Sequence, residues 1–282
     1  MKILVTGFNG KIGYEVARKA KEMNLQIVCA VRNVEKAKQK YGDDYEFVSL
    51  DFSRPETFQE ALMGVDRIFL MYPPGDNIQF ASFIEKVKDQ EIKHIVYLSL
   101  KDVQFMPFVH HFKNEKLIKK SKIPYTFLRA GYFMQNLNDF MLKEITERQR
   151  IFVPAGNGKT SFVDARDIAD LAVFSLTNTE QHRFQKYVIT GDEALDFFEV
   201  AKIMSEVLNT DIRYDNPSIK EFKEFMIKHG GDKGFINVVV GVHFPTKLGL
   251  AKGIKDDFEK VMNKKPTKIK KYIEDFKENW IS

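Results

Sequence analysis

The chain opens with Met1-Lys-Ile-Leu-Val-Thr-Gly-Phe-Asn-Gly-Lys-Ile-Gly13, a short apolar run followed by glycines at every third position. Apolar side chains then recur at helical spacing as far as Ala20. A strand, a tight turn and a helix start in this order form the frame in which a dinucleotide fingerprint occurs. Gly7 permits the turn, Gly10 lets a pyrophosphate approach the backbone, and Gly13 lets the helix lie close to the strand.

A purely structural turn is the alternative for these glycines, because any tight turn favours glycine. The position of the turn between a predicted strand and a predicted helix favours nucleotide binding instead. The N–H groups at the start of such a helix face the phosphates, and the helix dipole adds to their attraction.

The end of the second predicted strand indicates which nicotinamide cofactor is bound. NAD-binding sequences carry an acidic residue there for the ribose 2′-hydroxyl, but this chain has Arg32. A guanidinium suits a 2′-phosphate, and Lys36, one helical turn further, adds a second positive charge. The alternative is that Arg32 is only a solvated loop residue. We expect NADP(H) rather than NAD(H).

Strand and helix signals alternate through the first half of the chain with short connections. They predict an α/β fold with a doubly wound parallel Rossmann sheet, whose ligands bind at the carboxyl ends of the strands. Residues 236–242 are apolar and β-branched, and the pattern leaves their type open. Further strands are expected at residues 26–31, 45–50, 67–71, 94–99, 125–129 and 186–190, and helices at 55–64, 77–90, 109–121, 136–148, 167–176, 197–208 and 219–229.

The 282 residues are enough for one large domain and a smaller lobe. We expect an NADP-binding Rossmann domain at residues 1–153, completed by segments within 154–190, and a smaller, mostly helical lobe on the substrate side at residues 191–282. The net charge of +5 does not indicate nucleic acid as a partner, and no apolar run approaches the ~20 residues of a membrane span. Lys11 interrupts the first apolar run and Cys29 is the only cysteine, so we expect a cytoplasmic protein without a signal peptide.

Several motifs recur in an order and spacing that resemble one known family. They are Thr6-Gly-x-x-Gly-x-x-Gly13, Val31-Arg-Asn33, Leu50-Asp-Phe52, His94-Ile-Val-Tyr-Leu-Ser99, Ile123-Pro-Tyr-Thr-Phe-Leu-Arg129, Gly131-Tyr-Phe-Met-Gln-Asn136, Ser161-Phe-Val-Asp-Ala-Arg-Asp-Ile-Ala169 and Thr190-Gly-Asp-Glu-Ala194. Over roughly residues 1–225 the chain resembles the NmrA-like branch of the atypical short-chain dehydrogenases. That branch includes NADPH-dependent quinone reductases, triphenylmethane-dye reductases and redox-sensing regulators.

The resemblance implies a set of cofactor and substrate contacts. The glycine turn would hold the pyrophosphate, Arg32 and Lys36 the 2′-phosphate, and the residues after later strands the adenine, the nicotinamide ribose and the substrate. For the tyrosine and phenylalanine of the substrate set, core packing is the alternative. The implied cofactor residues are Gly7, Phe8, Asn9, Gly10, Lys11, Ile12, Gly13, Arg32, Lys36, Asp51, Phe52, Met71, Tyr72 and Pro73, and those of the nicotinamide and substrate pocket are Tyr132, Phe133 and Asn136.

Ordinary short-chain dehydrogenases place a Tyr-x-x-x-Lys motif on a helix, where the lysine tunes the tyrosine for proton transfer. Here that spacing occurs only at Tyr97 and Lys101, at the end of a predicted strand, and we interpret it as coincidence. The helix that should carry the motif has His111 and Glu115 on one face instead. They are the candidate catalytic pair, with a surface ion pair as the alternative. Two adjacent histidines point about 100° apart on a helix, so we expect no metal site.

A site without a strong acid limits the acceptor. Reduction of a ketone gives an alkoxide that needs a proton donor, whereas a reduced quinone resembles a phenolate, whose parent acid has a pKa near ~10. A cationic dye needs only the hydride. The sequence therefore predicts an NADPH-dependent reductase of flat conjugated acceptors. The alternative is a non-catalytic NADP(H)-sensing regulator that acts through a protein partner, while a nucleotide-sugar epimerase is disfavoured by the missing tyrosine. A monomer and a homodimer both remain open.

Overall fold

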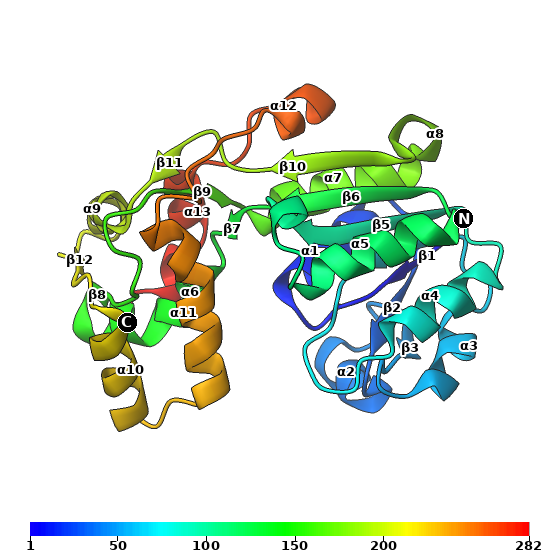
Figure 1. Cartoon of the computed structure of the whole chain (residues 1–282), viewed down its shortest axis with the longest axis horizontal. Coiled ribbons are helices and arrows are strands. Elements are labelled where there is room, and N and C mark those ends of the chain that lie inside the picture. The colour runs from blue at the N-terminus through cyan, green and yellow to red at the C-terminus, as the bar shows by residue number, and fades with distance from the viewer. Residues whose placement is uncertain (282) are drawn as a thin grey trace. The chain divides into compact units, whose positions relative to one another are not determined.

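The computed structural model describes residues 1–281 (Figure 1). The chain divides into two compact units. The first unit combines Met1–Ala130 with Ala165–Ile189, and the second combines Gly131–Asp164 with the chain from Thr190 onward. The chain therefore passes from one unit to the other after residues 130, 164 and 189. Residues 131–153 belong to the second unit in this division, whereas the sequence-based boundary places them in the Rossmann domain.

A seven-stranded parallel sheet, ordered β10-β6-β5-β4-β1-β2-β3, forms the centre of the first unit. The strand order reverses between β1 and β4, which is the switch point at which doubly wound sheets bind ligands. This confirms the predicted fold class. The strands are β1 (Lys2–Val5), β2 (Gln26–Val31), β3 (Phe47–Ser49), β4 (Arg67–Leu70), β5 (His94–Leu100), β6 (Tyr125–Ala130) and β10 (Gln185–Ile189).

Helices cover this sheet, and α1 packs beside α7 while α4 packs beside α3 and α5 (Figure 1). Residues 95–99 of β5 are all buried, as expected for a parallel strand that is covered on both faces. The predicted helix from residue 77 begins only at Phe80, because Asn77 has a φ of 55°, which an α-helix excludes. The helices of this unit are α1 (Lys11–Glu22), α2 (Val34–Tyr41), α3 (Phe58–Ala61), α4 (Phe80–Lys88), α5 (His110–Ser121), α7 (Ala165–Thr177) and α8 (Thr179–His182), with 3₁₀ turns η1 (Pro55–Thr57) and η2 (Val103–Phe105).

The second unit is mostly helical and carries two small sheets, β11-β9-β7 and β12-β8. The segment 236–242, whose type the sequence left open, lies inside helix α11. Capping boxes at Asp196 and Ser218 start α9 and α10, as each side chain accepts a hydrogen bond from the third helical residue. The elements are β7 (Tyr132–Phe133), β8 (Arg150–Ile151), β9 (Thr160–Val163), β11 (Ala194–Leu195), β12 (Arg213–Tyr214), α6 (Asn136–Arg148), α9 (Phe197–Leu208), α10 (Ile219–Lys228), α11 (Lys233–Lys247), α12 (Asp257–Met262), α13 (Ile269–Asp275) and η3 (Lys277–Asn279).

None of the helices within residues 1–281 combines the length and the apolar character that a membrane span requires.

Candidate functional site

The turn between β1 and α1 is built from its glycines. Gly7 has a φ of 69°, a conformation that other residues rarely adopt. The amide of Gly10 donates to the carbonyl of Gly7 at 2.9 Å, which closes the turn one residue before α1 begins. Because Gly10 is the N-cap, no side chain caps the helix, and its first N–H groups lack the acceptor one turn earlier that later residues have. The turn therefore presents a helix N-terminus suited to an anion.

The three glycines are required for different reasons. A Cβ atom on Gly13 would lie 2.3 Å from the carbonyl oxygen of Gly7, so the helix could not approach the strand. A Cβ on Gly7 would lie 2.7 Å from the sulfur of Met71. A Cβ on Gly10 would meet only the Gly7 oxygen, at 3.3 Å, and would otherwise enter open space. Gly7 and Gly13 thus build the turn, whereas Gly10 keeps its surface accessible.

A cleft of about 450 Å³ opens at the carboxyl ends of β1, β2, β3 and β4, on the surface that Gly10 leaves accessible. It matches the sequence-based expectation for ten of the fourteen cofactor residues. Lys11, Ile12, Gly13 and Lys36 do not line it. The lining residues expected from the sequence are Gly7, Phe8, Asn9, Gly10, Arg32, Asp51, Phe52, Met71, Tyr72 and Pro73, and those that sequence reasoning missed are Thr6, Ala30, Val31, Leu50, Ser53, Pro74, Gly75, Asp76 and Ile78.

The missed residues follow a simple signal, because most of them are the immediate neighbours of expected ones at strand ends. The Thr6 hydroxyl accepts a hydrogen bond from the Met71 amide at 2.8 Å, which ties the end of β1 to the segment after β4. No local pattern predicts this bond, since 65 positions separate the two residues. It holds these two segments together at the switch point.

Two expected cofactor residues contribute little side chain to the cleft. The side chain of Phe8 is fully buried, and its ring lies 4.9 to 5.8 Å from the rings of Tyr14, Tyr41, Tyr45 and Phe47. Phe52 is also buried and packs on other phenylalanines beneath the cleft. The floor of the cleft is therefore held by aromatic packing, and Phe8 offers it mainly backbone.

One end of the cleft carries exposed charge. Arg32 is exposed at the end of β2, and the next residue, Asn33, caps α2 by accepting the Lys36 amide at 2.8 Å. Across from it, Asp51 accepts hydrogen bonds from the amide and the hydroxyl of Ser53. These bonds, together with the charges of Arg32 and Arg54, lower the pKa of Asp51. The carboxylate is thus fixed by Ser53, and the Arg32 guanidinium remains available to an anion.

The other end of the cleft is aromatic. The half-buried Tyr72 stacks on the imidazole of His110, with ring centroids 4.9 Å apart and planes 16° apart. The ring of His111 lies edge-on to Tyr72 at 6.0 Å. Burial raises the pKa of Tyr72, so its hydroxyl is protonated at neutral pH. This end therefore offers flat aromatic surface.

His111 is engaged within the first unit. Its Nδ1 lies 2.8 Å from the hydroxyl of Tyr97, and that hydroxyl also accepts a hydrogen bond from Asn114 at 3.0 Å. Burial lowers the pKa of His111 to about 4, although the charge of Glu115 acts in the opposite direction. The cost of burying an imidazolium therefore outweighs the attraction of the Glu115 carboxylate. His111 is neutral at neutral pH.

Glu115 belongs to a separate network. It accepts hydrogen bonds from the Ser99 hydroxyl at 2.8 Å and from two guanidinium nitrogens of Arg129 at 2.9 and 2.7 Å. The shared helix face predicted for His111 and Glu115 is real, but their polar atoms bond to different partners. Tyr97 is buried in β5 and Lys101 pairs with Asp102 at 3.1 Å, so the Tyr-x-x-x-Lys spacing forms no catalytic pair.

The three expected substrate residues lie in the second unit. Tyr132 is buried, and its hydroxyl lies 2.7 Å from Nε2 of His243. Asn136 begins α6 and is buried, while Phe133 is half-buried in β7. The hydroxyl of Tyr132 is therefore used for packing within its own unit. The role of these residues in a substrate pocket stays a prediction.

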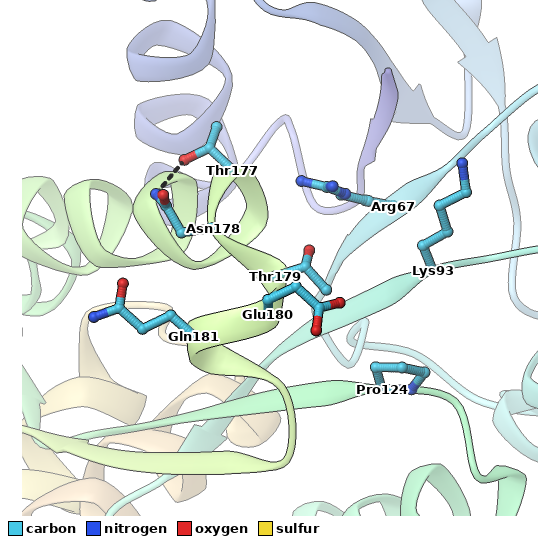
Figure 2. Close-up of a pocket in the computed structure, with 8 residues that line it drawn as sticks. All are labelled: Arg67, Lys93, Pro124, Thr177, Asn178, Thr179, Glu180 and Gln181. Carbon is cyan, nitrogen blue, oxygen red and sulfur yellow. Dashed lines mark hydrogen bonds between the residues drawn. The ribbon is translucent and has the colours of Figure 1, made fainter.

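A second hollow, of about 400 Å³, lies at the amino ends of strands of the seven-stranded sheet (Figure 2). The Arg67 guanidinium there donates to the carbonyl of Leu176, and Lys93 pairs with Asp66 at 3.2 Å. Parallel sheets bind ligands at the carboxyl ends of their strands, and these residues stand at the amino ends. The glycine-lined cleft, and not this hollow, therefore has the position expected of a ligand site. The residues of this hollow are Arg67, Lys93, Pro124, Thr177, Asn178, Thr179, Glu180 and Gln181.

Within residues 1–281 no group of histidine, cysteine, aspartate or glutamate side chains is arranged to hold a metal ion.

Comparison with known proteins identifies the family. The model of the NmrA-like family matches residues 1–273. The chain belongs to the NmrA-like family. The family and the Rossmann fold that the sequence predicted are thereby confirmed.

Three relatives illustrate the range of this NmrA-like group. The NAD(P)H azoreductase of Xenophilus azovorans is 34% identical over 236 residues, covering 81% of this chain and 81% of that protein. The prestalk A differentiation protein A of Dictyostelium discoideum is 30% identical over 236 residues, covering 82% of this chain and 77% of that protein. The triphenylmethane reductase of Citrobacter sp., solved in complex with NADP(H), is 27% identical, with a TM-score of 0.86 over 98% of this chain and 99% of that chain.

Proposed function

We propose that this protein is an NAD(P)H-dependent reductase that passes a hydride from NADPH to a flat conjugated acceptor such as a quinone or a dye. The observation that carries the proposal is the cleft at the switch point, which has an arginine at one end and stacked aromatic rings at the other. The oxidoreductase class has further support from the azoreductase and the triphenylmethane reductase to which the chain is similar.

The residues of the cleft fit a nicotinamide dinucleotide. The uncapped start of α1 and the open surface of Gly10 suit a pyrophosphate. Arg32 suits a 2′-phosphate, because its guanidinium is exposed at the rim, while Asp51 is held by Ser53. The volume of about 450 Å³ lies in the range of small-molecule sites.

When bound, NADPH would supply the hydride. The chain's own residues would then bind, orient and shield the reactants along the aromatic wall formed by Tyr72 and the rings of His110 and His111. His111 is neutral at neutral pH and bonded to Tyr97, and burial raises the pKa of Tyr97 well above its usual value. Such a wall suits acceptors whose reduced form water can protonate, or which carry a positive charge beforehand.

Measurement of NADPH oxidation tests the proposal directly. The unmodified protein would be mixed with NADPH and, in turn, with 1,4-benzoquinone, 1,4-naphthoquinone and a cationic triphenylmethane dye. We expect acceptor-dependent oxidation above the rate without protein, and a slower rate when the transferred hydrogen of NADPH is deuterium.

One relative gives a specific reason to keep a second candidate, because its name describes a developmental role in Dictyostelium discoideum rather than a reaction. That candidate is a non-catalytic NADP(H) sensor that acts through a protein partner. Tight NADPH binding without oxidation by any acceptor of the panel would favour the sensor and contradict the reductase.

A further inference from the structure

The loop between β5 and α5, residues 101–109, presents two aromatic rings to solvent. Phe105 is 75% exposed and Phe108 is 78% exposed, which makes them the two most exposed large apolar side chains of residues 1–281. Met106 and Pro107 lie between them. We call residues 101–109 the aromatic loop. Clustered exposed apolar side chains are characteristic of binding sites, whereas single exposed apolar residues need no explanation, and Phe105 and Phe108 are separated by only two residues in the sequence.

The exposure does not arise from a loose chain. Val103 is fully buried and anchors the aromatic loop. Backbone bonds close successive turns within it, from Phe105 to Asp102 at 3.0 Å, from Met106 to Val103 at 3.0 Å and from Val109 to Met106 at 3.2 Å. The loop therefore holds its two rings outward in an ordered conformation, although burial would stabilise them better.

A side-chain bond ties the aromatic loop to the sheet. The oxygen Oε1 of Gln104 accepts a hydrogen bond from Nη1 of Arg129 at 2.9 Å. Arg129 lies on β6 and is itself held by the buried carboxylate of Glu115. Gln104 therefore connects the segment that carries Phe105 to the Arg129–Glu115 ion pair.

The aromatic loop continues directly into the aromatic end of the cofactor cleft. Its last residue precedes His110, whose ring stacks on Tyr72, and Tyr72 lines the cleft. Phe108 is two residues before His110, so their Cα atoms lie at most about 7.6 Å apart. The loop follows the carboxyl end of β5, which is the ligand-binding edge of the sheet.

We propose that Phe105 and Phe108 determine acceptor specificity by providing the apolar surface on which a flat conjugated acceptor stacks, and that Gln104 is a positioning residue for this surface. The inference rests on the proposed reductase function and deepens it. The occupant is a small aromatic acceptor because the loop leads directly into His110, whose ring stacks on Tyr72 at the cleft, and aromatic rings bind flat π systems by offset or edge contacts.

The test compares Phe105→Ala and Phe108→Ala with a matched control, Phe184→Ala. Phe184 is also an exposed phenylalanine of the first unit, with 50% of its surface exposed. It directly precedes β10 and so stands at the amino ends of the strands, away from the aromatic loop. We expect the KM for 1,4-naphthoquinone to rise roughly 2- to 13-fold for each loop variant, the range of one aromatic contact. The KM for NADPH and the kinetics of the control should stay unchanged.

Gln104→Ala and Gln104→Glu test the positioning role. The alanine variant loses the acceptor for Arg129, so the KM for the quinone should rise while kcat and NADPH affinity stay the same. A carboxylate still accepts from Arg129, so the glutamate variant should restore the KM.

The outcomes separate this inference from the function on which it rests. If the unmodified protein oxidises no NADPH with any acceptor, the reductase proposal fails first. If it does, and the loop variants behave like Phe184→Ala, the aromatic loop does not bind the acceptor. Unchanged acceptor KM with a shifted gel-filtration volume would assign the rings to contacts between copies, and would also overturn the inference.

Discussion

The different roles of Gly10 and Gly13 allow binding and folding to be separated by two substitutions within one turn. Gly10 has φ −93° and ψ 163°, a conformation that valine adopts readily, and a Cβ there meets only one atom, at 3.3 Å. Gly10→Val should therefore change the free energy of unfolding by about 1 kcal/mol or less. A movement of a few tenths of an ångström relieves the single contact, and the lower chain entropy of valine in the unfolded state favours folding.

The same substitution should abolish most nucleotide affinity. The branched side chain would occupy the surface that a pyrophosphate must reach above the start of α1. The loss of one charge-assisted hydrogen bond costs about 1.5–3 kcal/mol, which corresponds to about a 12- to 160-fold increase in Kd, and the pyrophosphate would lose at least one. Titration followed by NADPH fluorescence measures the Kd, and urea denaturation followed by circular dichroism measures stability.

Gly13→Ala is the counterpart. Its Cβ would lie 2.3 Å from a backbone oxygen and 2.9 Å from the Phe8 amide nitrogen, so strand and helix must move apart. Overpacking of this kind costs about 1–3 kcal/mol of stability. The reasoning is refuted if Gly10→Val binds NADPH as the unmodified protein does, or if Gly13→Ala unfolds at the same urea concentration.

Three further predictions concern charged and titratable side chains. Arg32→Ala should reduce the preference for NADPH over NADH by about 12- to 160-fold. The control Arg54→Ala, at an exposed arginine outside the cleft, should leave the preference unchanged. Equal affinities of the unmodified protein for both nucleotides would contradict this prediction. His111→Ala should lower kcat by less than the ~10²-fold of a general acid and should leave the affinity for NADPH intact. Tyr97→Phe, which removes the hydroxyl bonded to His111, should lower kcat equally. A larger loss of kcat confined to His111→Ala would assign His111 a proton-transfer role. Burial lowers the pKa of His94 and of His243 to about 4, whereas the unfolded value is 6.5. Between about pH 6.5 and pH 4 the unfolded state therefore binds more protons, and the free energy of unfolding must fall as the pH falls. At pH 5 the loss is about 2 kcal/mol for each histidine, which urea denaturation at pH 7 and at pH 5 measures, and a pH-independent stability would exclude it.

The parts of the fold and site that follow from local chemistry could be predicted from the sequence. The glycine turn was predicted because backbone conformation and close approach restrict those positions to one residue type. The place of Arg32 at the end of the second strand was predicted because the apolar run of that strand stops at Val31. The burial of the strands followed from their uniformly apolar runs.

Features that depend on distant partners could not be predicted in this way. The separation of His111 from Glu115 depends on Tyr97 and Arg129, which reach them from neighbouring strands. Segment 236–242 is helical although it is rich in β-branched residues, because it lies within a longer helix that starts at an aspartate cap. Tertiary contacts decide both cases, and one sequence does not display them.

The path of the chain between the two units has a consequence for biosynthesis. β10 forms the edge of the seven-stranded sheet by pairing with β6, yet residues 131–164, which belong to the other unit, are translated between them. A ribosome that has released only residues 1–130 has therefore delivered the whole glycine cleft but not the last strand or α7, which packs on α1. The edge of β6 stays open for pairing until residue 189 emerges, and this interval is when the nascent chain is most exposed to aggregation through strand addition.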